Sequence, residues 1–126
     1  MAKSFPSRPS EDFRITSFAW QLDTEANHRN AGFPAIPPEV LARRFWQYLR
    51  FNQAHGLTTR TIAGCVEDIT PETELRNSDL TFYGYCFAQR YCDRWVARMH
   101  KDTGEAAEEH YLVKWFTQLQ AESVGA

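Results

Sequence analysis

The chain has 126 residues, of which 43% are hydrophobic, and it carries a formal net charge of −2. That length is typical of one domain, and that apolar content is enough to build a core without disulfides. The near-neutral charge lacks the basic excess of most nucleic-acid-binding domains, so nucleic acid is a disfavoured partner. No apolar run approaches the ~18 residues of a membrane-spanning helix, so we expect no membrane association.

The cysteines and the first residues both predict a reducing, intracellular location. Cys65, Cys86 and Cys92 are odd in number and have no CxxC spacing, so we expect three reduced thiols. The opening residues, MAKSFPSRPSED, contain no apolar stretch typical of a secretory signal. We therefore expect a cytoplasmic protein.

The N-terminal third is predicted to contain an arm, an ambiguous segment and a loop. Residues 1–11 are polar and contain two prolines, which is typical of a flexible tail. Residues 12–27 follow the helical period loosely, although FRITSFAW also has the composition of a strand. We favour a helix, because no other segment offers a convincing pairing partner. Residues 28–38 contain Gly32 and three prolines, which predicts a loop.

A helix is predicted from Pro38 to the residue before Gly56. Proline suits a first helical turn, the acid Glu39 favours the positive end of the helix, and glycine is a common C-terminal stop. One face collects Leu41, Phe45, Tyr48, Leu49 and Asn52 at helical spacing.

Within residues 57–79, residues 59–66 could form a short helix or an extended piece, and a short helix is plausible near 71–76. Helices at 59–66 and 71–79 would follow the long helix that begins at Pro38. Such a pair would form a degenerate helix-turn-helix, which makes a DNA-binding transcriptional regulator the second hypothesis for function. The turn between them has no glycine, and the second helix, PETELRNSD, contains three acids and one arginine. Because phosphates repel acids, we rank this hypothesis below protein binding.

The longest predicted helix covers residues 80–102, with Asn77, Ser78 or Asp79 as its cap. Gly104 ends it, and a final helix is predicted at 105–120. A joint at Thr103 and Gly104 is short enough to predict an antiparallel helical hairpin. An apolar ridge of the long helix, expected to be core, collects Leu80, Gly84, Phe87, Ala88, Tyr91, Trp95 and Met99.

These elements predict an all-α fold with four to five helices in one compact domain, residues 12–121. An irregular N-terminal arm, residues 1–11, precedes the domain, and a C-terminal tail, residues 122–126, follows it. The domain is expected to end in the antiparallel helical hairpin.

No motif predicts catalytic, cofactor-binding or metal-binding residues. The four histidines are scattered without zinc-site spacing, and GxSxG, HExxH and Gly-rich phosphate loops are absent from the sequence. We therefore expect no cofactor, and an enzyme with an unrecognised site is the third hypothesis.

The leading hypothesis is a small non-catalytic protein that binds another protein or itself, as bacterial adaptors, inhibitors and immunity proteins do. Phe51 and Phe82 project away from the main apolar faces of their helices, which favours exposure. A row of basic residues at helical spacing lies beside the aromatic ridge and has the chemistry of binding hot spots. A solvated helix flank is the competing interpretation of that row. The predicted partner-binding residues are Phe51, Phe82, Arg90, Arg94, Arg98 and Lys101.

Overall fold

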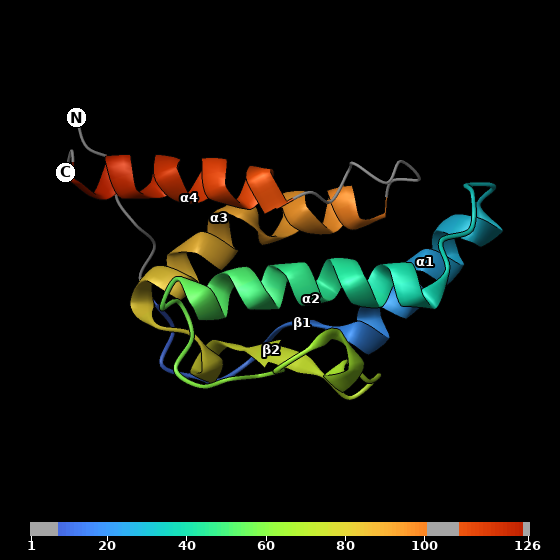
Figure 1. The fold of residues 1–126 in the computed structure, drawn as a ribbon, viewed down its shortest axis with the longest axis horizontal. Helices are drawn as coiled ribbons and strands as arrows, with labels where there is room; N and C mark the ends of the chain where they lie inside the picture. The colour runs from blue at the N-terminus through green and yellow to red at the C-terminus, as the bar shows by residue number, and fades with distance from the viewer. Residues whose placement is uncertain (1–7, 101–108, 125–126) are drawn as a thin grey trace.

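The computed structural model describes residues 8–100 and 109–124, and this part of the chain is predominantly helical (Figure 1). Its elements, in chain order, are β1 (Arg14–Ser17), α1 (Phe18–Asn30), α2 (Pro38–Ala54), β2 (Glu74–Arg76), α3 (Phe82–Met99) and α4 (Glu109–Val124). Two 3-10 turns, η1 (Val66–Asp68) and η2 (Asn77–Asp79), lie on either side of β2. The all-α prediction is confirmed in its helical character and wrong in omitting the two-stranded sheet.

Helix α2 is the centre of the fold. It lies between α4 on one side and the small sheet on the other (Figure 1), and it contacts α1, α3, α4 and η1. Its predicted bounds are confirmed, with Pro38 in the first turn and Gly56 just beyond the end at a φ of +68°. A positive φ favours glycine, which explains why the helix stops there.

The helix predicted for residues 12–27 is wrong in its first part. Arg14–Ser17 form an antiparallel strand with Glu74–Arg76, and the register is irregular between Arg14 and Thr16. The side chain of Ser17 then caps α1, because its Oγ accepts a hydrogen bond from Trp20 N at 3.1 Å. The partner that seemed to be missing is the segment predicted as the short helix at 71–76.

Residues 57–79 are all described, and they contain no α-helix. The helical alternative for 59–66, the predicted helix at 71–76 and the helix-turn-helix are therefore wrong. Side chains hold this backbone in place instead, because the oxygen of Gln53 accepts from Ile62 N at 2.6 Å and its amide donates to Ala63 O at 2.9 Å. Asp79 accepts from Arg76 N at 2.9 Å and pairs with Arg60 at 2.6 Å. Such bonds compete with helix formation.

Helix α3 begins later than predicted, at Phe82, and Thr81 is its cap. Thr81 Oγ1 accepts from Gly84 N at 3.2 Å, whereas the predicted caps form η2. The start of α3 packs very closely on the backbone of Leu57, whose carbonyl accepts a hydrogen bond from Thr81 N at 3.0 Å. A Cβ atom added to Gly84 would lie 2.0 Å from Leu57 O, so only glycine fits there.

Helix α4 runs to Val124, past the predicted end at residue 120, so residues 122–124 belong to a helix. The contacts between α3 and α4 run in opposite order along the two helices. Arg98 lies over the Tyr111 ring, and Arg90 pairs with Glu122. The predicted joint at Thr103 and Gly104 falls outside the described residues, so the hairpin itself stays a prediction.

The N-terminal arm is attached to the fold where it is described. Asn77 Nδ2 donates to the carbonyls of Pro9 and Glu11 at 3.2 and 3.1 Å, and Arg8 Nε donates to Asn77 Oδ1 at 3.1 Å. Residues 8–11 of the predicted flexible tail are therefore held against η2.

Large aromatic and aliphatic side chains from α2, α3 and α4 form the core. The ridge predicted on residues 80–99 is confirmed where its side chains are described, since Leu80, Phe87, Tyr91 and Trp95 are all buried. Tyr91 stacks on Trp115 of α4 with ring centroids 5.4 Å apart, which ties the two helices together.

Candidate functional site

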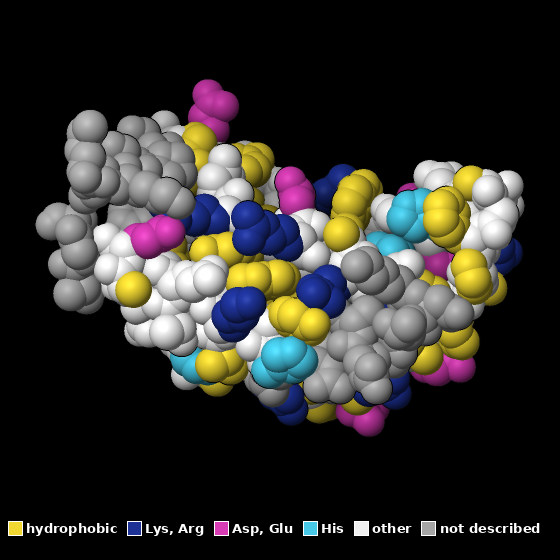
Figure 2. Space-filling model, turned by 90° about the horizontal axis from the view of Figure 1, so that it is seen from above, with side chains coloured by type: hydrophobic (Ala, Val, Ile, Leu, Met, Phe, Trp, Pro, Cys, Tyr) yellow, Lys and Arg dark blue, Asp and Glu magenta, His cyan; other side chains and the backbone are white. Residues whose placement is uncertain are grey.

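The outer side of α3 and α4 carries the three arginines predicted to bind a partner. We call Arg90, Tyr91, Arg94, Arg98 and Tyr111 the basic face. Viewed from the α4 side, Lys and Arg side chains gather among hydrophobic ones over these two helices (Figure 2). The three arginines are four residues apart, so each lies one turn beyond the last.

Tyrosine rings support two of these arginines. The guanidinium carbon of Arg94 lies 5.3 Å from the centroid of the Tyr91 ring, and that of Arg98 lies 3.4 Å from the centroid of the Tyr111 ring. Cation–π contacts of this kind orient the guanidinium group and reduce the entropy that it loses on binding. Arg94 is exposed, so its hydrogen-bond donors are accessible from solvent.

A hollow of about 700 Å³ opens beside this face between α3 and α4. Arg90 forms an ion pair with Glu122 there. Glu122 is the one acid among the described lining residues, which are Arg90, Tyr91, Arg94, Gln118, Ala121 and Glu122. The hollow is therefore suited to a negatively charged group.

The other predicted partner-binding residues do not join this face. Phe51 is fully buried, so its predicted exposure is wrong, and its ring packs between Phe87 and Phe116 with both centroids 5.7 Å away. Phe82 is 47% exposed but lies two helical turns before Arg90. Lys101 falls outside the described residues. Sequence reasoning missed Tyr111 and Glu122, because only the packing of α4 on α3 brings them to the arginines.

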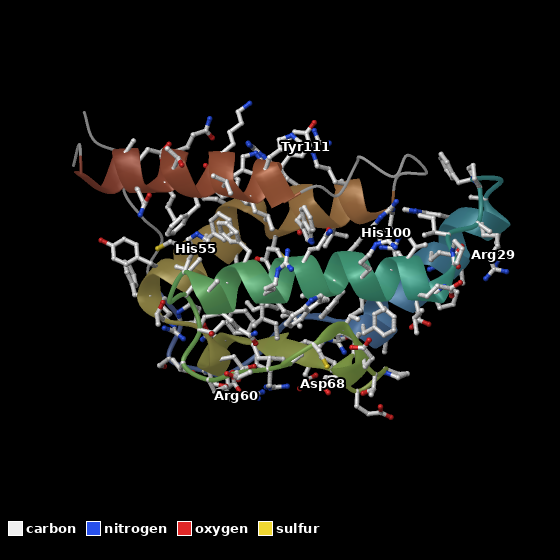
Figure 3. The ribbon with its side chains drawn as sticks, in the orientation of Figure 1. Arg29, His55, Arg60, Asp68, His100 and Tyr111 are labelled. Carbon is white, nitrogen blue, oxygen red and sulfur yellow. The ribbon has the colours of Figure 1, made fainter. Side chains whose placement is uncertain are left out.

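A second hollow, of about 410 Å³, lies at the C-terminal end of α2. It is lined by His55, Gly56, Leu57, Thr81, Tyr83, Phe116, Leu119 and Gln120. Figure 3 places His55 at the C-terminal end of α2, on the side that faces α4. The walls are mainly apolar and aromatic, so this hollow differs in chemistry from the basic face.

A polar cluster joins the end of α3 to α1. His100 Nε2 donates to Gln21 Oε1 at 2.6 Å, and the centroids of the His28 and His100 rings are 5.4 Å apart. Figure 3 shows His100 at the end of α3. Burial, together with the charge of His28, lowers the pKa of His100 to about 4. The backbone N–H of Ile36 donates to the Glu25 carboxylate at 3.1 Å. This hydrogen bond lowers the pKa of Glu25, although burial by itself would raise it. Gln21, Glu25 and Arg44 are buried, whereas His28 is exposed, so the cluster lies at the edge of the junction between these helices.

The described residues give no metal-binding constellation. Within residues 8–100 and 109–124, no group of three or more His, Cys, Asp or Glu side chains could hold a metal ion. The three cysteines are free thiols, with Cys65 exposed and Cys86 and Cys92 buried. In this same part of the chain, no helix combines the length and apolar character needed to cross a membrane.

Comparisons of the chain with protein-family models, with curated proteins and with solved structures give no match. The chemistry of the surface therefore carries the functional proposal.

Proposed function

We propose that this protein is non-catalytic and acts by binding another protein through the basic face of α3 and α4. One observation supports the proposal above all others. Three arginines follow one another at one-turn intervals, two of them lie over tyrosine rings, and Arg90 and Arg94 line a hollow of about 700 Å³. Arginine and tyrosine are enriched among the residues that contribute most to protein interfaces.

The charges of the face indicate an acidic partner. The whole chain has a net charge of −2, yet this face presents Arg90, Arg94 and Arg98. Glu122, the one acid among the described lining residues of the hollow, pairs with Arg90. Arginine binds carboxylates in a bidentate manner, and Arg94 is exposed for such contacts. A partner segment with Asp or Glu at helical spacing would match the one-turn repeat of the arginines.

A nucleic acid is the weaker candidate for the same surface. Phosphates also bind arginine, but the helix-turn-helix that motivated the DNA hypothesis is absent from residues 57–79. A chain of net negative charge also lacks the long-range attraction that DNA-binding proteins usually show.

Affinity capture from native host extract, followed by mass spectrometry, tests the proposal. The test variant is R94E/R98E, and the control is R43E/R50E, which makes the same charge change on exposed arginines of α2. Loss of a hot-spot residue costs about 2 kcal/mol, so we expect at least ~30-fold weaker capture by the test variant and full capture by the control. Equal capture by both variants would contradict the proposal.

Two further measurements separate the alternatives. Sedimentation of the purified protein shows whether the partner is a second copy, in which case R94E/R98E should abolish self-association. Binding to duplex DNA is measured at two salt concentrations. Tight, salt-sensitive DNA binding without any protein partner would favour the regulator hypothesis over protein binding.

A further inference from the structure

The apolar hollow at the C-terminal end of α2 has the size and lining of a small-molecule site. Its volume of about 410 Å³ falls within the usual range for ligand pockets, roughly 300–1,000 Å³. It lies between the end of α2, the start of α3 and the second half of α4. We call it the α2–α4 pocket, and its lining residues are those given above.

The walls of the pocket favour an uncharged ring. Leu57 and Leu119 are buried in the core, while the rings of His55, Tyr83 and Phe116 supply flat surfaces. No Asp, Glu, Lys or Arg is among its described lining residues. A charged ligand would therefore lose hydration without gaining a counter-ion.

The backbone around the pocket is already fixed in its shape. Leu57 N donates to Asn52 O at 2.9 Å, and Leu57 O accepts from Thr81 N at 3.0 Å. The tight contact between Gly84 and Leu57 holds the start of α3 against this turn. A preformed pocket loses little entropy when a ligand enters, so even a small molecule can bind measurably.

His55 lines the pocket, and one of its two ring nitrogens contacts the protein backbone. Its ring is stacked on Phe51 at 4.0 Å between centroids and meets Phe116 at 5.2 Å. His55 Nδ1 lies 2.9 Å from Phe51 O, and a carbonyl oxygen accepts but does not donate. In the neutral ring the proton is therefore on Nδ1, which leaves the Nε2 lone pair for a ligand.

The hydroxyl of Thr81 is already used within the protein. Thr81 Oγ1 accepts from Gly84 N at 3.2 Å and donates to Leu57 O at 3.3 Å. The hydroxyl proton of Thr81 is therefore not available to a ligand.

We propose that the α2–α4 pocket binds a small uncharged aromatic molecule with a hydrogen-bond donor, of the phenol or indole class. The ring lies against Phe116, and the donor O–H or N–H bonds to His55 Nε2. The residues of this pocket differ from those of the basic face, so the proposal stands or falls independently of the proposed protein partner.

Ligand titrations with the full chain, followed by calorimetry and by NMR chemical shifts, test the proposal. The probes are phenol and indole, toluene as a ring without a donor, benzoate as a charged ring, and cyclohexanol as a non-aromatic alcohol. We expect phenol and indole to bind and toluene to bind about tenfold more weakly, because it lacks one hydrogen bond. Benzoate and cyclohexanol should bind more weakly than phenol.

Variants of the chain locate the site and identify its acceptor. H55F keeps an aromatic ring on Phe51 but removes Nε2, so the affinity for phenol should fall to that for toluene, with toluene unchanged. Gln120 is exposed at the pocket rim, and Q120W should fill the pocket and abolish binding of both rings. F33A removes a 62% exposed ring elsewhere and should bind like the wild type.

Three results would overturn the inference. The first is failure of both phenol and indole to bind the wild type at millimolar concentrations. The second is unchanged binding to Q120W, which remains a valid test even when H55F fails to fold. The third is equal affinity of the wild type for phenol and toluene, which would show an apolar hollow without the proposed acceptor.

Discussion

Replacing Gly84 with alanine tests the closest contact in the fold. Gly84 is in the first turn of α3, and its φ is not in the left-handed region. Alanine is the best helix former, so the intrinsic helix propensity by itself predicts a gain of at most about 1 kcal/mol. The contact with Leu57 predicts the opposite sign.

The structure shows which effect is larger. The new Cβ would lie 2.0 Å from Leu57 O and 3.0 Å from Leu57 C, both of which are backbone atoms. Van der Waals radii require the Cβ and Leu57 O to be more than about 1 Å further apart, so the backbone of α3 or of Leu57 must shift by that amount. Overpacking of this kind costs about 1–3 kcal/mol or more. The same shift weakens the bonds from Leu57 to Asn52 and Thr81, at about 0.5–1.5 kcal/mol each. We expect G84A to lose about 2–4 kcal/mol of unfolding free energy after the helix-propensity gain is subtracted.

Urea denaturation followed by circular dichroism measures the change. The matched control is A97G, the reverse substitution at an exposed position of the same helix, which should lose about 1 kcal/mol from helix propensity alone. If G84A is as stable as the wild type or more stable, the close packing of α3 on Leu57 is refuted.

Other predictions test the core, the histidine cluster and the thiols. F51A should lose about 3–5 kcal/mol of unfolding free energy because Phe51 is fully buried, whereas F82A should lose less than about 1; equal losses would contradict the assigned burial. The pKa of His100 is about 4 in the folded state, against 6.5 for the free side chain, so the folded protein resists protonation there. The unfolding free energy should therefore fall as the pH drops from about 6.5 towards 4. Urea denaturation should show a smaller decrease for H100N than for the wild type between pH 7 and 5, and equal decreases would contradict this prediction. Thiol labelling should modify only the exposed Cys65 in the native protein. After denaturation it should also modify Cys86 and Cys92, which are buried in the fold.

Local signals in the sequence were sufficient for the elements that are set by neighbouring residues. Pro38, Glu39 and Gly56 predicted α2 because helix ends depend on nearby caps and stops. The spacing of Phe87 and Trp95 predicted their burial, since a periodic apolar ridge needs only a surface to pack on. The arginine row was predicted for the same reason, because one-turn spacing is a property of a single helix.

The tertiary structure decided what depends on residues far apart in the chain. Arg14–Ser17 became a strand because Glu74–Arg76 lie beside it. The composition of FRITSFAW allowed a strand, but nothing in the sequence identified a partner so far along the chain. Phe51 is buried because α4 covers a side of α2 that its own spacing leaves open. The basic face likewise needs Tyr111 from one helix beneath Arg98 from another, a contact that exists only once the helices pack. Local propensities act over a few residues, whereas burial and pairing act between whatever segments the fold brings together.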